Sequence, residues 1–208
     1  MTHDIVDQIV GVTPELDALR RRRPVTREQL QASFDALFRP VSEEHVSQAE
    51  RELIAAFATR LAGSTDPTGT FYADRALAAD PQHAALVLTE AADAAVAGPF
   101  GAYTESGLQD ENTEGERYTP SDAAAEALGE RLAAALAHTH LLVFRPREAA
   151  ATDISRLLDA GWSADGIITL SQLVSFLAFQ QRVITGLRTL AAAGFATTAA
   201  VDSEEEAA

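Results

Sequence analysis

The sequence predicts an all-α protein, and three observations support this. Alanine, the residue that most favours helix, is concentrated in three stretches, residues 73–97, 123–137 and 191–200. Aromatic residues make up only 6% of the chain, and the alternating pattern typical of strands is scarce. The segment from Gly161 to Leu190 has helical spacing and is apolar on more than one face. A helix that is apolar nearly all round lies in a protein core, so this segment is expected to be the central, buried helix.

Residues 1–41 are expected to form an N-terminal helical arm. A first helix should begin after Thr13, with Pro14 at its first position, because these are favoured start signals. Pro24 should end it. Thr26 and Gln29 then have the spacing of a capping box for a second helix, which Pro40 should end.

Residues 42–193 are expected to form the main helical domain. Its first helix should run from about Ser42 to Ala62, followed by a short helix over 71–79 and another from Asp80 to near Gly98. Residues 98–120 then form a long segment rich in glycine and proline, either an ordered lid or interface loop or a mobile one. Its aromatic residues favour an ordered segment.

The second half of this domain is expected to contain three helices. The first runs from Ser121 to about Ala137, and residues 138–144 either extend it or form a short irregular segment. A helix over 152–160 follows, and Ser163 should cap the long apolar helix. Residues 194–208 form an acidic tail. The block 42–97 does not look stable alone, so one domain is expected.

Composition limits the possible functions. The net charge of −15 argues against binding to nucleic acid or to anionic membrane surfaces. The four arginines at 20–23 either complement a helix dipole or form a small phosphate-binding patch. The complete absence of cysteine excludes disulfides, thiolate metal sites and thiol redox chemistry. The N-terminus does not have the pattern of a signal peptide, and the longest strictly apolar run, Phe176–Phe179, is too short to cross a bilayer. A soluble, cytoplasmic protein is therefore expected.

Two segments resemble the signature regions of a known family. Residues 50–63 read ERELIAAFATRLAG, and residues 156–187 read RLLDAGWSADGIITLSQLVSFLAFQQRVITGL. They are similar to the two signature regions of the alkyl hydroperoxidase D-like, or carboxymuconolactone decarboxylase (CMD), family. Trp162–Ser163 and Gln181–Arg182 are the more specific parts of the match. The resemblance covers roughly 42–190, and the N-terminal arm with the 98–120 segment suggests the peroxidase-related subgroup.

The resemblance implies a small all-α bundle that assembles into trimers or hexamers. In the family's peroxidases, two cysteines at a helix N-terminus reduce a peroxide, with a glutamate and a histidine relaying protons. Its decarboxylases act on a lactone acid with a histidine and acidic groups. Glu52 matches the relay glutamate, and Ser64 falls at the first cysteine. Phe71 stands at the second cysteine and Asp74 at the histidine, so thiol peroxidase chemistry is excluded.

Three residues are candidate catalytic groups: Glu52, Asp74 and His45. Glu52 is either a buried general acid or base or, as the favoured alternative, a half-exposed glutamate that pairs with a nearby arginine, namely Arg51, Arg60 or Arg182. Since His45 precedes Glu52 by seven residues, two helical turns, both could face one pocket. Asp74 is either a site residue or the partner of Arg75.

Three further residues are candidate binding groups: Tyr72, Arg182 and Ser64. Tyr72 could contribute a hydroxyl to a pocket. Arg182 is expected to be buried, either holding a substrate carboxylate or, as the favoured alternative, forming an ion pair with Glu50 or Glu52. His138 and His140 have no carboxylate at a typical ligand spacing, so no metal site is predicted. No cofactor is predicted either.

The sequence leaves two main functions open. The first is a cysteine-less family member that binds a small molecule, or acts on it by acid–base, lyase-like chemistry. The second is a noncatalytic subunit or scaffold that pairs with a cysteine-bearing relative. Peroxide chemistry with a borrowed cofactor ranks last. Self-association is expected in each case.

Overall fold

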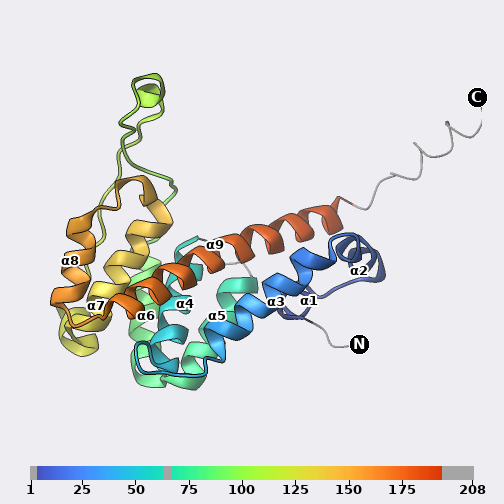
Figure 1. Cartoon of the computed structure of the whole chain (residues 1–208), viewed down its shortest axis with the longest axis horizontal. Helices are drawn as coiled ribbons and strands as arrows, with labels where there is room; N and C mark the ends of the chain where they lie inside the picture. The colour runs from blue at the N-terminus through green and yellow to red at the C-terminus, as the bar shows by residue number, and fades with distance from the viewer. Residues whose placement is uncertain (1–3, 63–66, 194–208) are drawn as a thin grey trace, which may run out of the picture.

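The computed structural model describes residues 4–62 and 67–193 and is helical throughout its regular parts (Figure 1). The helices in order are α1 (Ile5–Val10), α2 (Pro14–Arg21), α3 (Pro24–Phe38), α4 (Gln48–Ala62), α5 (Pro67–Ala79), α6 (Pro81–Asp93), α7 (Asp122–Phe144), α8 (Ala151–Asp159) and α9 (Ala164–Ala192). Two short 3-10 helices occupy Ser106–Glu111 and Pro146–Glu148. The predicted all-α class is confirmed. The predicted acidic tail, 194–208, lies outside the described residues.

The centre of the bundle is α4, not α9. Helix α4 packs against α5, α6, α7 and α9, and its residues from Arg51 to Thr59 are all buried. Helix α9 packs its N-terminal half against α4 and α7, then extends past the bundle, where the N-terminal arm covers one side of it (Figure 1). Phe179 and Leu190 are about half exposed as a result. The prediction that α9 is a buried central helix, apolar nearly all round, was therefore wrong: one face is exposed along the helix, including Ile168 near its start, while Ile184 and Leu187 are buried.

Helix α9 is the one helix of the described residues that is long and apolar enough to cross a membrane by length and composition. The core helices of soluble proteins pass the same test. Two polar residues in the middle of α9 bond other helices: Gln180 accepts a hydrogen bond from Tyr72, and Gln181 donates one to the carbonyl oxygen of Thr59. Such bonds between buried amides and neighbouring helices are typical of a core helix, although the Nε2 of Gln180 has no hydrogen-bond partner among the described residues.

The N-terminal arm packs on the bundle through apolar and charged contacts. Thr13 caps α2 as predicted, since its hydroxyl accepts a hydrogen bond from the amide of Leu16. Helix α3 begins at Pro24, two residues before the predicted cap at Thr26, because proline presets the first helical turn. The rings of Phe34 and Phe38 stack, and Phe38 also contacts Tyr72 of α5. The arm thus forms one wall of the core around α5.

A buried ion-pair cluster joins the three helices of the arm. The carboxylates of Asp4 and Asp7 accept hydrogen bonds from the guanidinium groups of Arg20 and Arg27. Burial opposes ionisation of Asp4, but the bonds from Arg20 and the amide of Asp7 outweigh it and hold its pKa below the usual value. Arg20 and Arg21 lie in the last turn of α2, as the predicted dipole role requires. A phosphate-binding patch would not include Arg20, because its side chain is buried in this cluster.

Several element boundaries differ from the sequence prediction. Helix α4 begins six residues later than predicted, at Gln48, where Glu50 accepts hydrogen bonds from the amide and hydroxyl of Ser47. Helix α7 continues through residues 138–144, so of the two alternatives for these residues the longer helix is confirmed. Ser163 caps α9 as predicted, accepting a hydrogen bond from the amide of Gly166.

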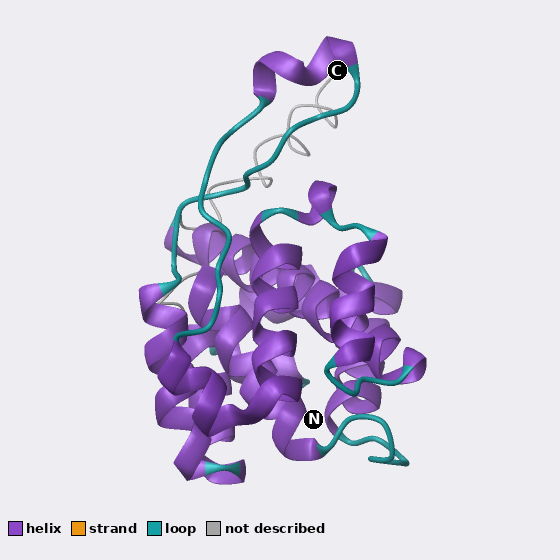
Figure 2. Cartoon of the chain, turned by 90° about the vertical axis from the view of Figure 1, so that its left-hand side faces the viewer, coloured by secondary structure: helices purple, strands orange, loops and turns teal. Residues whose placement is uncertain are grey.

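Residues 98–120 project away from the bundle, with the 3-10 helix Ser106–Glu111 at the tip (Figure 2). The amide of Phe100 donates a hydrogen bond of 2.6 Å to the carbonyl oxygen of Phe144, at the base of the projection. Gly101 and Thr113 form an isolated antiparallel bridge there. The tip of this segment points into solvent. Its shape therefore does not fit the lid, which was one of the predicted alternatives.

Candidate functional site

The position that the sequence matches to the family's proton relay is occupied by a buried ion pair. The Glu52 side chain on α4 is 4% exposed, and the Arg75 guanidinium on α5 reaches both of its oxygens. The Arg75 Nε–Glu52 Oε2 distance is 2.9 Å. Gln48, one turn earlier on α4, donates a further bond of 2.6 Å to Glu52. The favoured prediction of a half-exposed glutamate was therefore wrong, because Glu52 is buried and pairs with Arg75.

Three aromatic rings surround the Arg75 side of this pair. The Arg75 guanidinium carbon lies 5.2 to 5.6 Å from the ring centroids of Phe34, Phe38 and Phe71. Two of these rings belong to the N-terminal arm and one to α5, so the arm closes over the pair. Cations stack favourably on aromatic faces at such distances. Glu52 therefore has no open approach from this side for a substrate.

The other predicted catalytic residues do not converge on Glu52. Asp74 is exposed and forms no pair with Arg75, whose donors bond Glu52 instead. His45 precedes α4 rather than lying on it, so the expected two-turn spacing along a helix does not apply. Its ring faces the start of α9, with Nδ1 3.1 Å from the hydroxyl of Ser163 and Nε2 3.5 Å from Asp165. The constellation of His45, Glu52 and Asp74 is therefore not formed.

The predicted binding residues are also separated. Tyr72 is fully buried, and its hydroxyl donates a bond of 2.7 Å to Gln180. Burial raises the pKa of Tyr72 far above its usual value, so the hydroxyl stays neutral. Ser64 lies outside the described residues.

Arg182 differs most from its prediction. It is exposed, and its Nη1 donates a bond of 2.9 Å to the carbonyl oxygen of Ala178 on the same helix. The predicted ion pairs of Arg182 with Glu52 or Glu50 are absent, because Glu52 bonds Arg75 and Glu50 bonds Arg131 at 2.6 Å. The residue directly before Arg182 is buried. One step along a helix turns the side chain by about 100°, which takes the guanidinium away from α4.

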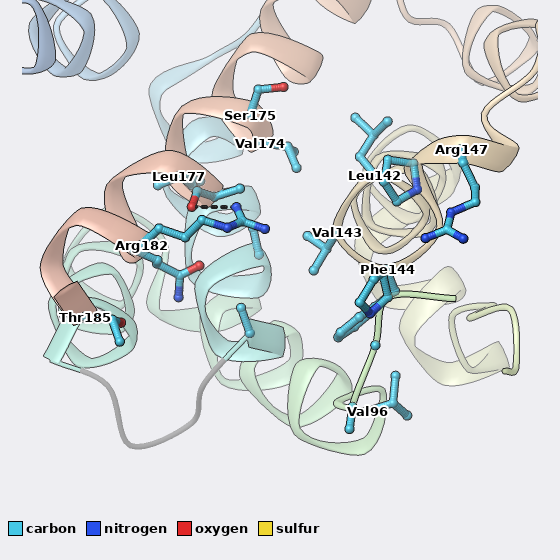
Figure 3. A pocket seen from close by; sticks show the side chains of 18 of the residues that line it. Val96, Leu142, Val143, Phe144, Arg147, Val174, Ser175, Leu177, Arg182 and Thr185 are labelled. Carbon is cyan, nitrogen blue, oxygen red and sulfur yellow. Dashed lines mark hydrogen bonds between the residues drawn. The ribbon is translucent and has the colours of Figure 1, made fainter. Parts of the chain in front are cut away.

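Arg182 instead lines a groove between α9 and the C-terminal end of α7 (Figure 3). The groove has a volume of about 960 Å³. Its walls are apolar, with Leu142, Val143 and Phe144 on α7 facing Val174 and Leu177 on α9. Arg147, from the 3-10 helix after α7, also lines the groove and is drawn beyond the end of α7 as seen from Arg182. Neither Arg147 nor the groove was predicted from the sequence, since both depend on how α7 and α9 meet.

A second cavity of about 400 Å³ lies between α7 and α8 and the end of the projecting segment. It is lined by His138, which is 5% exposed and has no hydrogen-bond partner at either ring nitrogen. Burial lowers the pKa of His138, against the attraction of Asp153, so the ring is neutral at pH 7. Buried water is the ordinary partner for such a group, and a neutral, buried imidazole has no charge to offer a ligand.

Two comparisons with known proteins give no match. The chain matches no family model, and no curated protein is similar enough to count as a match. Within the residues that the structure describes, no group of three His, Asp or Glu side chains is arranged to hold a metal ion. The function must therefore be inferred from the geometry of the chain's own residues.

Proposed function

We propose that the chain is a cysteine-less relative of the alkyl hydroperoxidase D-like, or CMD, family that binds a small molecule without using Glu52 as a catalytic group. The two sequence segments that resemble the family, together with the all-α fold, support the relationship. The observation on which the noncatalytic role rests is the Glu52–Arg75 pair. A carboxylate held by two guanidinium bonds and one bond from the Gln48 amide has little capacity left to exchange protons with a substrate.

Acid–base catalysis by the predicted constellation has weaker support than binding. A general base must lie within hydrogen-bond reach of the proton that it takes. Glu52 is buried and bonded by Arg75, Asp74 faces solvent, and His45 faces the start of α9. The α7–α9 groove, by contrast, has the size and apolar lining of a small-molecule site. Binding is therefore the function that we favour, in a soluble, cytoplasmic protein.

A noncatalytic partner subunit is the second candidate. The same closed Glu52–Arg75 position favours it, because a subunit that has lost its reactive groups can still keep the fold through which the family assembles. This candidate and small-molecule binding are compatible in one protein.

The proposal predicts that the purified chain neither reduces an alkyl hydroperoxide with a thiol reductant nor consumes the lactone acid on which the family's decarboxylases act. The reason is that the chain has no thiol and that Glu52 is bonded to Arg75. Peroxide consumption and release of carbon dioxide are the measurements. Turnover that disappears in a folded Glu52→Gln variant would restore a catalytic Glu52 and overturn the noncatalytic role.

The resemblance further predicts self-association into trimers or hexamers. Sedimentation at micromolar concentration should give three or six times the chain mass of 22.1 kDa. Exposed apolar residues on the outer face of α9, Ile168 and Phe179, are available for such contacts. A single species at the mass of one chain would contradict this prediction.

A further inference from the structure

The α7–α9 groove joins an apolar interior to two cationic groups that carboxylates of the protein do not neutralise. Among the described residues, no Asp or Glu lies within ion-pair distance of Arg147 or Arg182. Arg20, Arg75 and Arg131 form ion pairs, whereas the exposed Arg22, Arg23 and Arg188 form none among the described residues. Arg147 and Arg182 differ from those exposed arginines because they line an apolar groove. The groove therefore presents positive charge in a strongly acidic protein.

Both guanidinium groups are positioned by contacts that leave donors unused. Arg182 uses Nη1 to bond the carbonyl oxygen of Ala178. The guanidinium carbon of Arg147 lies 3.9 Å from the ring centroid of Tyr103, at the base of the projecting segment, and Nη1 makes a long bond of 3.4 Å to the carbonyl oxygen of Gly101. A guanidinium has five N–H donors. Each arginine therefore keeps donors for a ligand while its side chain is held near the groove.

We propose that this groove binds an amphipathic organic acid, with its apolar body along the α7 and α9 walls and its carboxylate bonded by Arg182. Arg147, at the α7 end of the same groove, adds positive charge to its rim. This inference rests on the proposed binding function and names the chemical class of the ligand. It does not involve Glu52 or the second cavity.

Size and charge together favour a small acid over a protein partner or a second copy of the chain. A volume of about 960 Å³ lies at the upper end of the range of small-molecule sites, roughly 300–1,000 Å³. The apolar residues line the interior, while the arginines lie on its walls. Carboxylates bond guanidinium groups in a planar, two-point geometry that a neutral ligand does not provide. A ligand that satisfies both features has one acidic group and an apolar chain.

The test is calorimetric titration of the full chain with octanoate, decanoate and 1-octanol at pH 7.5 and low salt. Both acids should bind at one site, because their chains bury apolar surface in the groove. Each buried methylene should tighten binding about fourfold, so decanoate should bind roughly fifteenfold more tightly than octanoate. Octanol should bind at least tenfold more weakly than octanoate, since it lacks the charge that Arg182 recognises.

Three variants locate the site. Arg182→Gln should weaken decanoate binding about tenfold. Arg188→Gln, a change to an exposed arginine on the same helix outside the groove, should leave it unchanged. Ser175→Trp, at an exposed position that lines the groove, should abolish binding by filling the space. Because 175, 182 and 188 are exposed, thermal melts of all three variants should match that of the unmodified chain.

The outcomes separate this inference from the proposed function. If decanoate binds and Ser175→Trp or Arg182→Gln binds it as tightly as the unmodified chain, the ligand lies elsewhere, so the groove inference fails while the binding function stands. If neither acid binds and Ser175→Trp lowers the sedimenting mass, the groove is an interface between copies and the inference is overturned. If neither acid binds and the mass is unchanged, the assigned ligand class is wrong. The turnover assays decide the noncatalytic role independently.

Discussion

Replacing Arg75 with methionine should destabilise the protein by about 3 kcal/mol, because it removes one partner of a buried ion pair. The Glu52 side chain is 4% exposed and that of Arg75 30%, so the loss should lie at the lower end of the range for such changes. Methionine keeps an apolar side chain against Phe34 and Phe38, so the rings retain most of their packing. The cost then arises from the Glu52 carboxylate, which is left with Gln48 alone.

Urea unfolding monitored by circular dichroism measures this loss, and a double variant identifies its cause. Adding Glu52→Gln to Arg75→Met removes the unpaired charge, so the double variant should be more stable than Arg75→Met alone. Arg39→Met is the matched control, since this exposed arginine pairs only with Asp35 at the surface. It should change the free energy of unfolding by less than about 0.5 kcal/mol. Equal losses in the free energy of unfolding for Arg75→Met and Arg39→Met would show that the buried Glu52–Arg75 pair stabilises the protein no more than a surface ion pair does.

Most helices could be predicted from the sequence because their starts depend on local chemistry. Thr13 before Pro14, and Ser163 before α9, each supply a side-chain oxygen that accepts an amide proton of the first turn. The start of α4 was missed because Ser42 is as plausible a cap as Ser47 in sequence. The helix begins after Ser47 because the amide and the hydroxyl of Ser47 both donate hydrogen bonds to Glu50. Arg131 of α7 donates a further bond to Glu50 and so positions its side chain. That contact joins residues 81 positions apart, which no local pattern reveals.

The rotation of α9 explains why the role of Arg182 was predicted incorrectly. Residues around Arg182 are apolar on several faces, so hydrophobic periodicity does not indicate which face meets α4. The contacts of the two preceding glutamines, to Tyr72 and to the carbonyl oxygen of Thr59, decide it. Both glutamines point inward, and Arg182 follows on the solvent side.

The sequence left the burial of Glu52 open and did not reveal its partner. Leu53, Ala56 and Phe57 surround Glu52 in sequence and place it on an apolar helix. Arg75 lies 23 residues further on, and its side chain reaches Glu52 only because α5 packs against α4. In the sequence, the neighbouring carboxylate of Asp74 looks like the natural partner of Arg75. Adjacent residues on a helix point in directions about 100° apart, which separates Asp74 from the pair.

Replacing Asp7 with alanine should destabilise the N-terminal arm by about 3–5 kcal/mol, the range for breaking a buried pair from one side. The Asp7 side chain is 0% exposed and bonds both Arg20, whose side chain is 7% exposed, and Arg27. Without Asp7, Arg20 keeps only its bond of 2.9 Å to Asp4. Alanine itself favours helix, so the loss cannot be attributed to the propensity of α1.

Hydrogen exchange should show where this loss acts. Helices α1 and α3 pack on the outside of the bundle, against α4, α5 and α9, whereas α4 is enclosed by α5, α6, α7 and α9. The arm is therefore expected to open before the core around α4 does. Amides of α1 to α3 should therefore exchange much faster in Asp7→Ala than in the unmodified chain, while those of α4 change less. Asp110→Ala is the control, because this exposed carboxylate lies at the tip of the projecting segment. Uniform acceleration across α1 to α9 would mean that the arm unfolds together with the bundle, and an unchanged arm would show that the Asp7 cluster does not hold it in place.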